Sequence, residues 1–154
     1  MTNNELLAAL PALLPKAIGW AEAMEKDILA RGQPLTARMV TVARIVGVGR
    51  PEDVRILEVD RIPMPENEEL RQAAMVTGLF NPDITGMTFG HGIVICKGHW
   101  TTRLVSHELR HVHQYEAAGS VAAFLPVYLH QVAVHGYHDA PLERDARGHE
   151  TTVS

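Results

Sequence analysis

The segment "LVSHELRHVHQYE", residues 104–116, contains side chains that bind metal ions and transfer protons. Its pattern of apolar residues predicts a helix. Residues four apart on a helix lie one above the other, so His107 and His111 would present their imidazole rings to the same point. A Zn²⁺ ion binds such nitrogens at about 2.0 to 2.1 Å. The pair therefore predicts a metal site on this helix.

Glu108 follows the first of these histidines and is offset from them around the helix. It is therefore not expected to bind the metal, but its carboxylate can reach a water on the open side of the ion. There it would accept a proton as a general base. His113 and Glu116 face other sides of the same helix and are not expected to join the cluster.

A catalytic zinc needs a third protein ligand. The downstream candidates are His130, His135, His138, Asp139, Glu143 and Asp145. We favour Glu143, because Pro141 is typical of a helix start and places Glu143 in the first turn of a new helix. The small Ala146 on the same face would let that helix approach the first one. His138 is the second choice, and the alternative reading of Glu143 is a glutamate that stabilises the helix dipole.

The remaining sequence predicts the elements that position these side chains. Helices are expected at residues 4–31, with Pro15 at a start or break, and from Thr36 to Gly47. Strands are expected at residues 54–62 and 88–96, with a short acidic helix at 66–75 between them. The histidine-rich helix would end at Gly119, and another, kinked at Pro126, would run from Ser120 to Gly136. The tail "GHETTVS" is expected to be frayed.

Length and composition favour one domain. The chain has 154 residues, of which 46% are hydrophobic, enough for a single core. We therefore expect one α+β domain over residues 1–154, with a scaffold at 1–75 and a metal-site region at 84–148. Cys96 is the only cysteine, so no disulfide can form within the chain.

Charge and hydropathy indicate which classes of partner and which cellular location to expect. The net charge is −4 and the basic residues are scattered, so we expect no nucleic-acid partner. No apolar run approaches the roughly 20 residues that cross a bilayer, and the N-terminus lacks the basic region of a signal peptide. We therefore expect a cytoplasmic protein with no membrane partner, while unconventional export stays open. No feature of the sequence predicts the oligomeric state.

The string "SHELRHVHQYE", followed after a helix by "GYHDAPLERDAR", resembles the gluzincin group of zinc metallopeptidases. It is most similar to small bacterial members with a His-Glu-x-x-His helix and a later Glu-x-x-Ala ligand helix. The resemblance covers about residues 84–148 and implies a zincin-like fold. It implies that His107, His111 and Glu143 bind zinc, with water completing the tetrahedron, and that Glu108 is the base.

The upstream "ITGMTFGHGIVI" is similar to the edge strand that precedes the active-site helix in such proteins. The resemblance implies that this strand, here Gly92, Ile93, Val94 and Ile95, holds an extended peptide substrate by β-augmentation.

Two features of the site are less well defined by the pattern. Many gluzincins have an acidic residue four positions after the ligand glutamate, where this chain has Arg147; Asp145 is the nearest carboxylate. The pattern does not fix the group that stabilises the oxyanion. Tyr137 and His138 are the candidates by position, and the alternative reading of Tyr137 is a half-buried aromatic residue.

These observations predict a zinc-dependent metallopeptidase that cleaves a peptide or protein substrate. The alternative is a zincin-fold binding or accessory module that holds a metal but has no protease activity. The third possibility is a helical scaffold with incidental histidines and no metal. The presence of Glu108 favours the enzyme, because a purely structural metal site has no use for a base.

Overall fold

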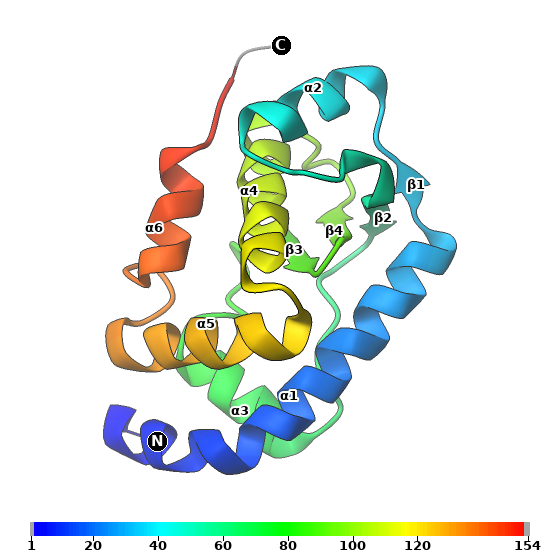
Figure 1. Ribbon diagram of the computed structural model, residues 1–154. Coiled ribbons are helices and arrows are strands. Elements are labelled where there is room, and N and C mark those ends of the chain that lie inside the picture. Colours follow the sequence, from blue (N-terminus) through cyan, green and yellow to red (C-terminus); the bar gives the residue numbers. More distant parts are fainter. Residues whose placement is uncertain (1, 153–154) are drawn as a thin grey trace.

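The computed structural model describes residues 2–152, which form a mixed α+β fold of six α-helices around a small four-stranded sheet (Figure 1). The elements in chain order are α1 (Asn3–Arg31), β1 (Gln33–Pro34), α2 (Ala37–Ile45), η1 (Pro51–Asp53), β2 (Arg55–Val59), α3 (Glu68–Val76), β3 (Gly86–Phe89), β4 (Gly92–Cys96), α4 (Thr102–Ala118), α5 (Val121–His135) and α6 (Pro141–Gly148). The predicted α+β class and the order of its helices are confirmed.

The sheet has the strand order β1-β2-β4-β3. β2 and β4 are parallel, whereas β1 and β3 are antiparallel to their neighbours. The extended segment predicted at residues 88–96 is in fact a hairpin. Its two strands are joined by Gly90 and His91, and Gly90 has a φ of +63°. This left-handed conformation favours glycine at the first position of such a tight turn.

The expectation that residues 92–95 form an edge strand is wrong. β4 lies between β2 and β3 and pairs with both, so Gly92, Ile93, Val94 and Ile95 have no free edge to offer to a peptide. All four are buried. A strand covered on both faces is apolar throughout rather than alternating, and "IVIC" has this pattern. Within residues 2–152, the edge strand on this side of the sheet is β3, the neighbour of β4.

α1 continues through Pro11 and Pro15, so the predicted start or break at Pro15 is not present. Both prolines are exposed, and Figure 1 shows that the helix bends between its first and second halves. Proline removes one hydrogen bond and bends a helix without necessarily ending it. By length and composition α1 could also cross a membrane, a criterion that core helices of soluble proteins meet as well.

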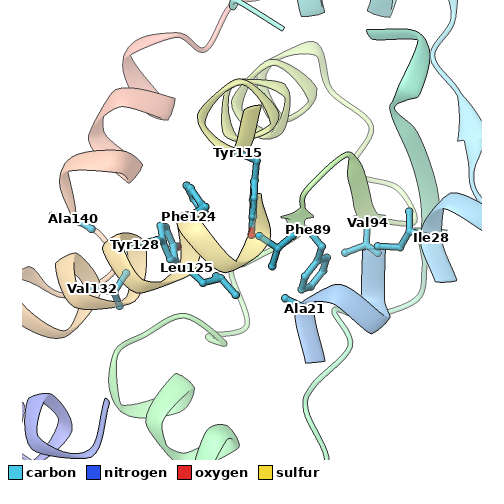
Figure 2. Packing of buried hydrophobic residues seen from close by; sticks show 11 residues of the cluster. Ala21, Ile28, Phe89, Val94, Tyr115, Phe124, Leu125, Tyr128, Val132 and Ala140 are labelled. Atoms are coloured by element: carbon cyan, nitrogen blue, oxygen red, sulfur yellow. The ribbon is translucent and has the colours of Figure 1, made fainter. Parts of the chain in front are cut away.

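α4 is held against the sheet by its apolar face. Leu109 and Val112 are fully buried in one cluster with Ile93 and Ile95 of β4. α1 contributes Ile28 to a second cluster, which extends through the aromatic residues of α4 and α5 (Figure 2). The helix that carries the histidines is therefore fixed both to the sheet and to α5.

Candidate metal centre

Three side chains from two helices meet in the interior. The Nε2 atom of His107 lies 3.1 Å from Oε1 of Glu143, and Nε2 of His111 lies 3.0 Å from Oε2 of the same carboxylate. All three residues are buried, and their ligand atoms lie within 4.8 Å of one another. The structure thus brings together the three residues predicted as ligands, and this group could hold a metal ion.

Local sequence explains how each helix presents its part of the group. α4 is capped at its N-terminus by Thr101, whose side chain accepts a hydrogen bond from the backbone N–H of Leu104, and at its C-terminus by Gly119, which has a φ of +102°. α6 begins with Pro141, as predicted. Ala146 is completely buried where α6 packs on α4, and its small side chain permits the close approach that places Glu143 beside the histidines.

The three groups stabilise one another's charges. Burial opposes a charge on His111, but Glu143, with smaller contributions from Glu108 and Gln114, outweighs burial and raises the pKa of His111 to about 9. Burial likewise raises the pKa of Glu143, yet the charges and hydrogen bonds of the two imidazoles lower it well below its usual range. A buried carboxylate that stays ionised between two ring nitrogens is a suitable environment for a cation.

His107 is oriented by a residue from the C-terminal tail. Its Nδ1 lies 2.8 Å from Oε2 of Glu150, and Arg103 donates to the other oxygen of that carboxylate. The backbone N–H of Thr151 donates to Ser106 of α4. The prediction of a frayed tail is therefore wrong for residues 148–152, because these contacts hold it on α4. Residues 153 and 154 lie outside the described part.

His111 is oriented from its own helix. Its Nδ1 lies 2.8 Å from Oε1 of Gln114, whose amide nitrogen donates to the backbone of Leu142 and to Asp145. Asp145 also accepts from Arg110 at 2.8 Å. Asp145, the nearest carboxylate in the sequence, thus supports His111 only through Gln114. In both histidines the bond at Nδ1 turns Nε2 towards Glu143.

Glu108 is buried beside β3. Its Oε1 accepts a hydrogen bond of 2.8 Å from the hydroxyl of Thr88. At Gly86 a Cβ atom would lie only 3.2 Å from Cγ of Glu108, so the absence of a side chain there makes room for the glutamate. Thr88 could not be predicted from sequence, because its approach to Glu108 depends on how β3 lies against α4.

Two tyrosines adjoin the group. Tyr128 of α5 donates a hydrogen bond of 2.7 Å to Oε2 of Glu143 and was not predicted. Tyr137, one of the two candidates for the oxyanion group, is half-buried and lines the same cavity as Glu108 and His111. Burial, followed by nearby carboxylate charge, raises the pKa of both phenols. Each phenol therefore stays protonated, and Tyr128 uses its proton in the hydrogen bond to Glu143.

The other predicted candidates lie away from the group. His138 is exposed and pairs with its neighbour Asp139 at 3.1 Å, so neither serves as a ligand beside α4. His130 and His135 are also exposed. His113 lies within 2.9 Å of a backbone carbonyl in the loop after α2, which agrees with its predicted position on another side of the helix.

Glu150 and Gln114 had weak signals in the sequence. Glu150 is seven residues after Glu143, a spacing that corresponds to about two helical turns and the same face. Gln114 is three residues after His111, within reach on one helix. Tyr128 had no signal, since only the packing of α5 against α6 brings it to Glu143.

The chain was compared with models of known protein families, with curated proteins and with solved structures. None of the three comparisons gives a match. The function of this protein therefore has to be inferred from its own residues and their geometry.

Proposed function

We propose that this protein is a zinc-dependent hydrolase of the metallopeptidase type, built on a zincin-like domain. The observation that supports it is that Glu108 is buried and lines the same cavity as His111 and Glu143, which form the candidate ligand group with His107. A group that only held a metal for stability would not need an adjacent buried carboxylate supported by its own hydrogen bond.

Zinc is the metal that this set of donors fits best. Two imidazole nitrogens and one carboxylate oxygen are a usual set for a catalytic zinc, which has three protein ligands and one open position. Structural zinc sites have four protein ligands, most often with cysteine, and the single cysteine here is in β4. When bound, the ion would polarise a carbonyl group and lower the pKa of a water molecule.

The residues around the ligands then have distinct roles. Glu108 accepts the proton of the attacking water and delivers it to the leaving amine. Thr88 holds one of its oxygens, which leaves Oε2 for the proton. Tyr128 fixes the carboxylate of Glu143. Tyr137 donates to the oxygen on which negative charge develops. Together these roles describe amide hydrolysis of a peptide or protein.

The test is hydrolysis by the purified chain supplied with one equivalent of zinc. Casein is the substrate, and new amino termini are measured by mass spectrometry. We expect cleavage by the wild type and by His138→Ala, the matched control at an exposed histidine. Glu108→Gln should retain zinc and lose at least about 100-fold in rate, the usual contribution of a general base.

Two results would contradict the proposal. If Glu108→Gln cleaves as fast as the wild type, the assigned mechanism is wrong. If the zinc-loaded wild type cleaves neither casein nor any amide substrate, the protein is a metal-binding module rather than an enzyme.

A further inference from the structure

A large apolar cavity opens on the metal centre. Glu108, His111 and Glu143 are among the residues that line it, and most of the remaining wall comes from α1, α3 and α5. Its volume, counted as the space open to the centre of a water molecule, is about 130 Å³. One water molecule needs about 10 to 15 Å³ of such space, so the cavity has room for a ligand about as large as ten water molecules.

The cavity follows one face of α1. Leu6, Leu10, Leu13, Ala17 and Ala21 line it at intervals of three or four residues. At a rise of 1.5 Å per residue, the helix from the first to the last of these is about 22 Å long. The face of α1 that lines the cavity is therefore longer than any single amino-acid side chain.

The opposite walls are equally apolar. α3 contributes Ala73 and Ala74, and α5 contributes Leu129 and Val132. Figure 2 shows Val132 on the same helix as Tyr128, the tyrosine that contacts Glu143. The apolar wall thus leads along α5 directly to the metal centre.

The chemistry of these walls distinguishes between two possible ligands, an extended peptide and an unbranched hydrocarbon chain. An extended peptide would bring one N–H and one C=O group per residue, and each would need a partner when buried. Away from the metal centre the walls offer few such partners, and the hydroxyl of Thr77 already donates to the backbone of Ala74. An unbranched hydrocarbon chain has no polar groups to satisfy.

We propose that this cavity binds a long aliphatic acyl chain of the substrate, with the carbonyl at its end presented to the metal centre. The preferred substrate is then a long-chain N-acyl amide, such as a fatty-acylated peptide, and an unacylated peptide such as casein, which leaves the cavity empty, is cleaved more slowly. Hydrolysis breaks the bond between the carbonyl carbon and the nitrogen. Water supplies OH to the carbonyl carbon and a proton to the amine, so the products are a fatty acid and a free amine. The hydrolysis step rests on the proposed function, whereas binding of the chain does not.

The first experiment measures binding without metal or catalysis. The chain, treated with a chelator, is titrated with straight-chain alcohols from butanol to dodecanol. Trp20 lines the cavity, and Trp100→Phe removes the other tryptophan, so the emission reports Trp20 alone. We expect saturable binding of one alcohol per chain. Affinity should rise about fourfold per added methylene until the cavity is filled.

A pair of variants on α1 tests the location. Ala17→Phe places a ring in the cavity, whereas Ala12→Phe places the same ring on the exposed side of the helix. Ala17→Phe should abolish saturable binding of dodecanol and Ala12→Phe should retain it. If Ala17→Phe does not fold, the chain-length series on the wild type still decides. Absence of saturable binding, or affinity independent of chain length, overturns the proposal.

The second experiment compares substrates for the zinc-loaded chain. An N-dodecanoyl dipeptide should be hydrolysed with a kcat/KM at least about 100-fold above that of its N-acetyl counterpart, since several methylenes are buried. The rates on N-dodecanoyl alanine and on an N-dodecanoyl decapeptide are also compared. Faster hydrolysis of the first indicates that the natural acyl amide is a free acyl amino acid, and faster hydrolysis of the second indicates an acylated protein. Binding of alcohols without any hydrolysis would support the acyl-chain site and contradict the proposed hydrolase function. Equal rates of hydrolysis on the dodecanoyl and acetyl dipeptides would overturn the acyl-chain site alone.

Discussion

Nδ1 of His107 lies 2.8 Å from Oε2 of Glu150, so a residue beyond the end of α6 orients a candidate metal ligand on α4. The carboxylate holds the ring so that Nε2 points at Glu143. Such a contact also makes the ligating nitrogen a better donor. Glu150 is therefore a positioning residue for the metal centre.

Replacing Glu150 should weaken metal binding without removing a ligand. We expect Glu150→Gln to lower zinc affinity by about 10- to 100-fold, the usual effect of losing such an outer partner. Titration against a chelator of known affinity measures it. Arg103→Ala is the control, because it removes only the exposed partner of the same carboxylate and should change affinity less than about fivefold. Unchanged affinity in Glu150→Gln would contradict the assigned role.

Removing Glu143 should abolish tight zinc binding and also destabilise the fold. Glu143→Ala leaves the buried hydroxyl of Tyr128 and two ring nitrogens without their carboxylate partner. An unpaired buried polar group costs about 1 to 3 kcal/mol. Zinc content by atomic absorption and urea unfolding of the metal-free chain measure the two effects. A variant that retains one zinc per chain would show that the third ligand lies elsewhere.

The hydroxyl of Thr88 should matter for catalysis and not for metal binding. Thr88→Val preserves shape but removes the hydrogen bond to Glu108. Hydrogen bonds to charged groups contribute about 1.5 to 3 kcal/mol, so kcat should fall by about 10- to 100-fold at unchanged zinc content. Thr41→Val is the matched control on the exposed side of α2. If both variants retain full kcat, Thr88 does not support the base.

The features that were predicted correctly depend on residues close together in the chain. The spacing of His107 and His111 fixes their relation on one helix, and Pro141 marks the start of the helix that presents Glu143. The end of the histidine-rich helix at Gly119 is equally local. These signals need no knowledge of the tertiary fold, and the structure places all of these residues as expected.

The features that were missed depend on contacts between distant segments. β4 was expected at an edge, but strand order is set by the return of β3 on one side and the parallel pairing with β2 on the other. Thr88 and Tyr128 reach the centre only because β3 and α5 pack against α4 and α6. Glu150 was assigned to a frayed tail because its partner is 43 residues away in sequence.

Glu116 gives a prediction for acid stability that does not involve the metal centre. Burial raises the pKa of this carboxyl, but hydrogen bonds from the backbone of Gly49 and from His91 outweigh it, so the pKa is lowered. Backbone N–H of Arg50 donates to it as well. A carboxyl whose pKa is lower in the folded state stabilises the fold fully above the unfolded value of about 4.3. This contribution is lost as the pH falls through the folded value.

The variant Glu116→Gln should therefore have a lower free energy of unfolding than the wild type at pH 7. The difference should shrink as the pH falls below about 4.3. Urea unfolding at a series of pH values measures it. Glu22→Gln, at an exposed position on α1, controls for the change in net charge. A difference that stays constant down to low pH would contradict the account of Glu116.

The most direct test of the central claim is anomalous diffraction at the zinc edge from crystals of the chain grown with zinc. The predicted result is one peak within about 2.0 to 2.2 Å of Nε2 of His107, Nε2 of His111 and a carboxylate oxygen of Glu143. Glu108 should lie beside the peak without binding it. A peak that excludes Glu143, one bound by Glu108, or no peak between α4 and α6 would contradict the proposed metal centre.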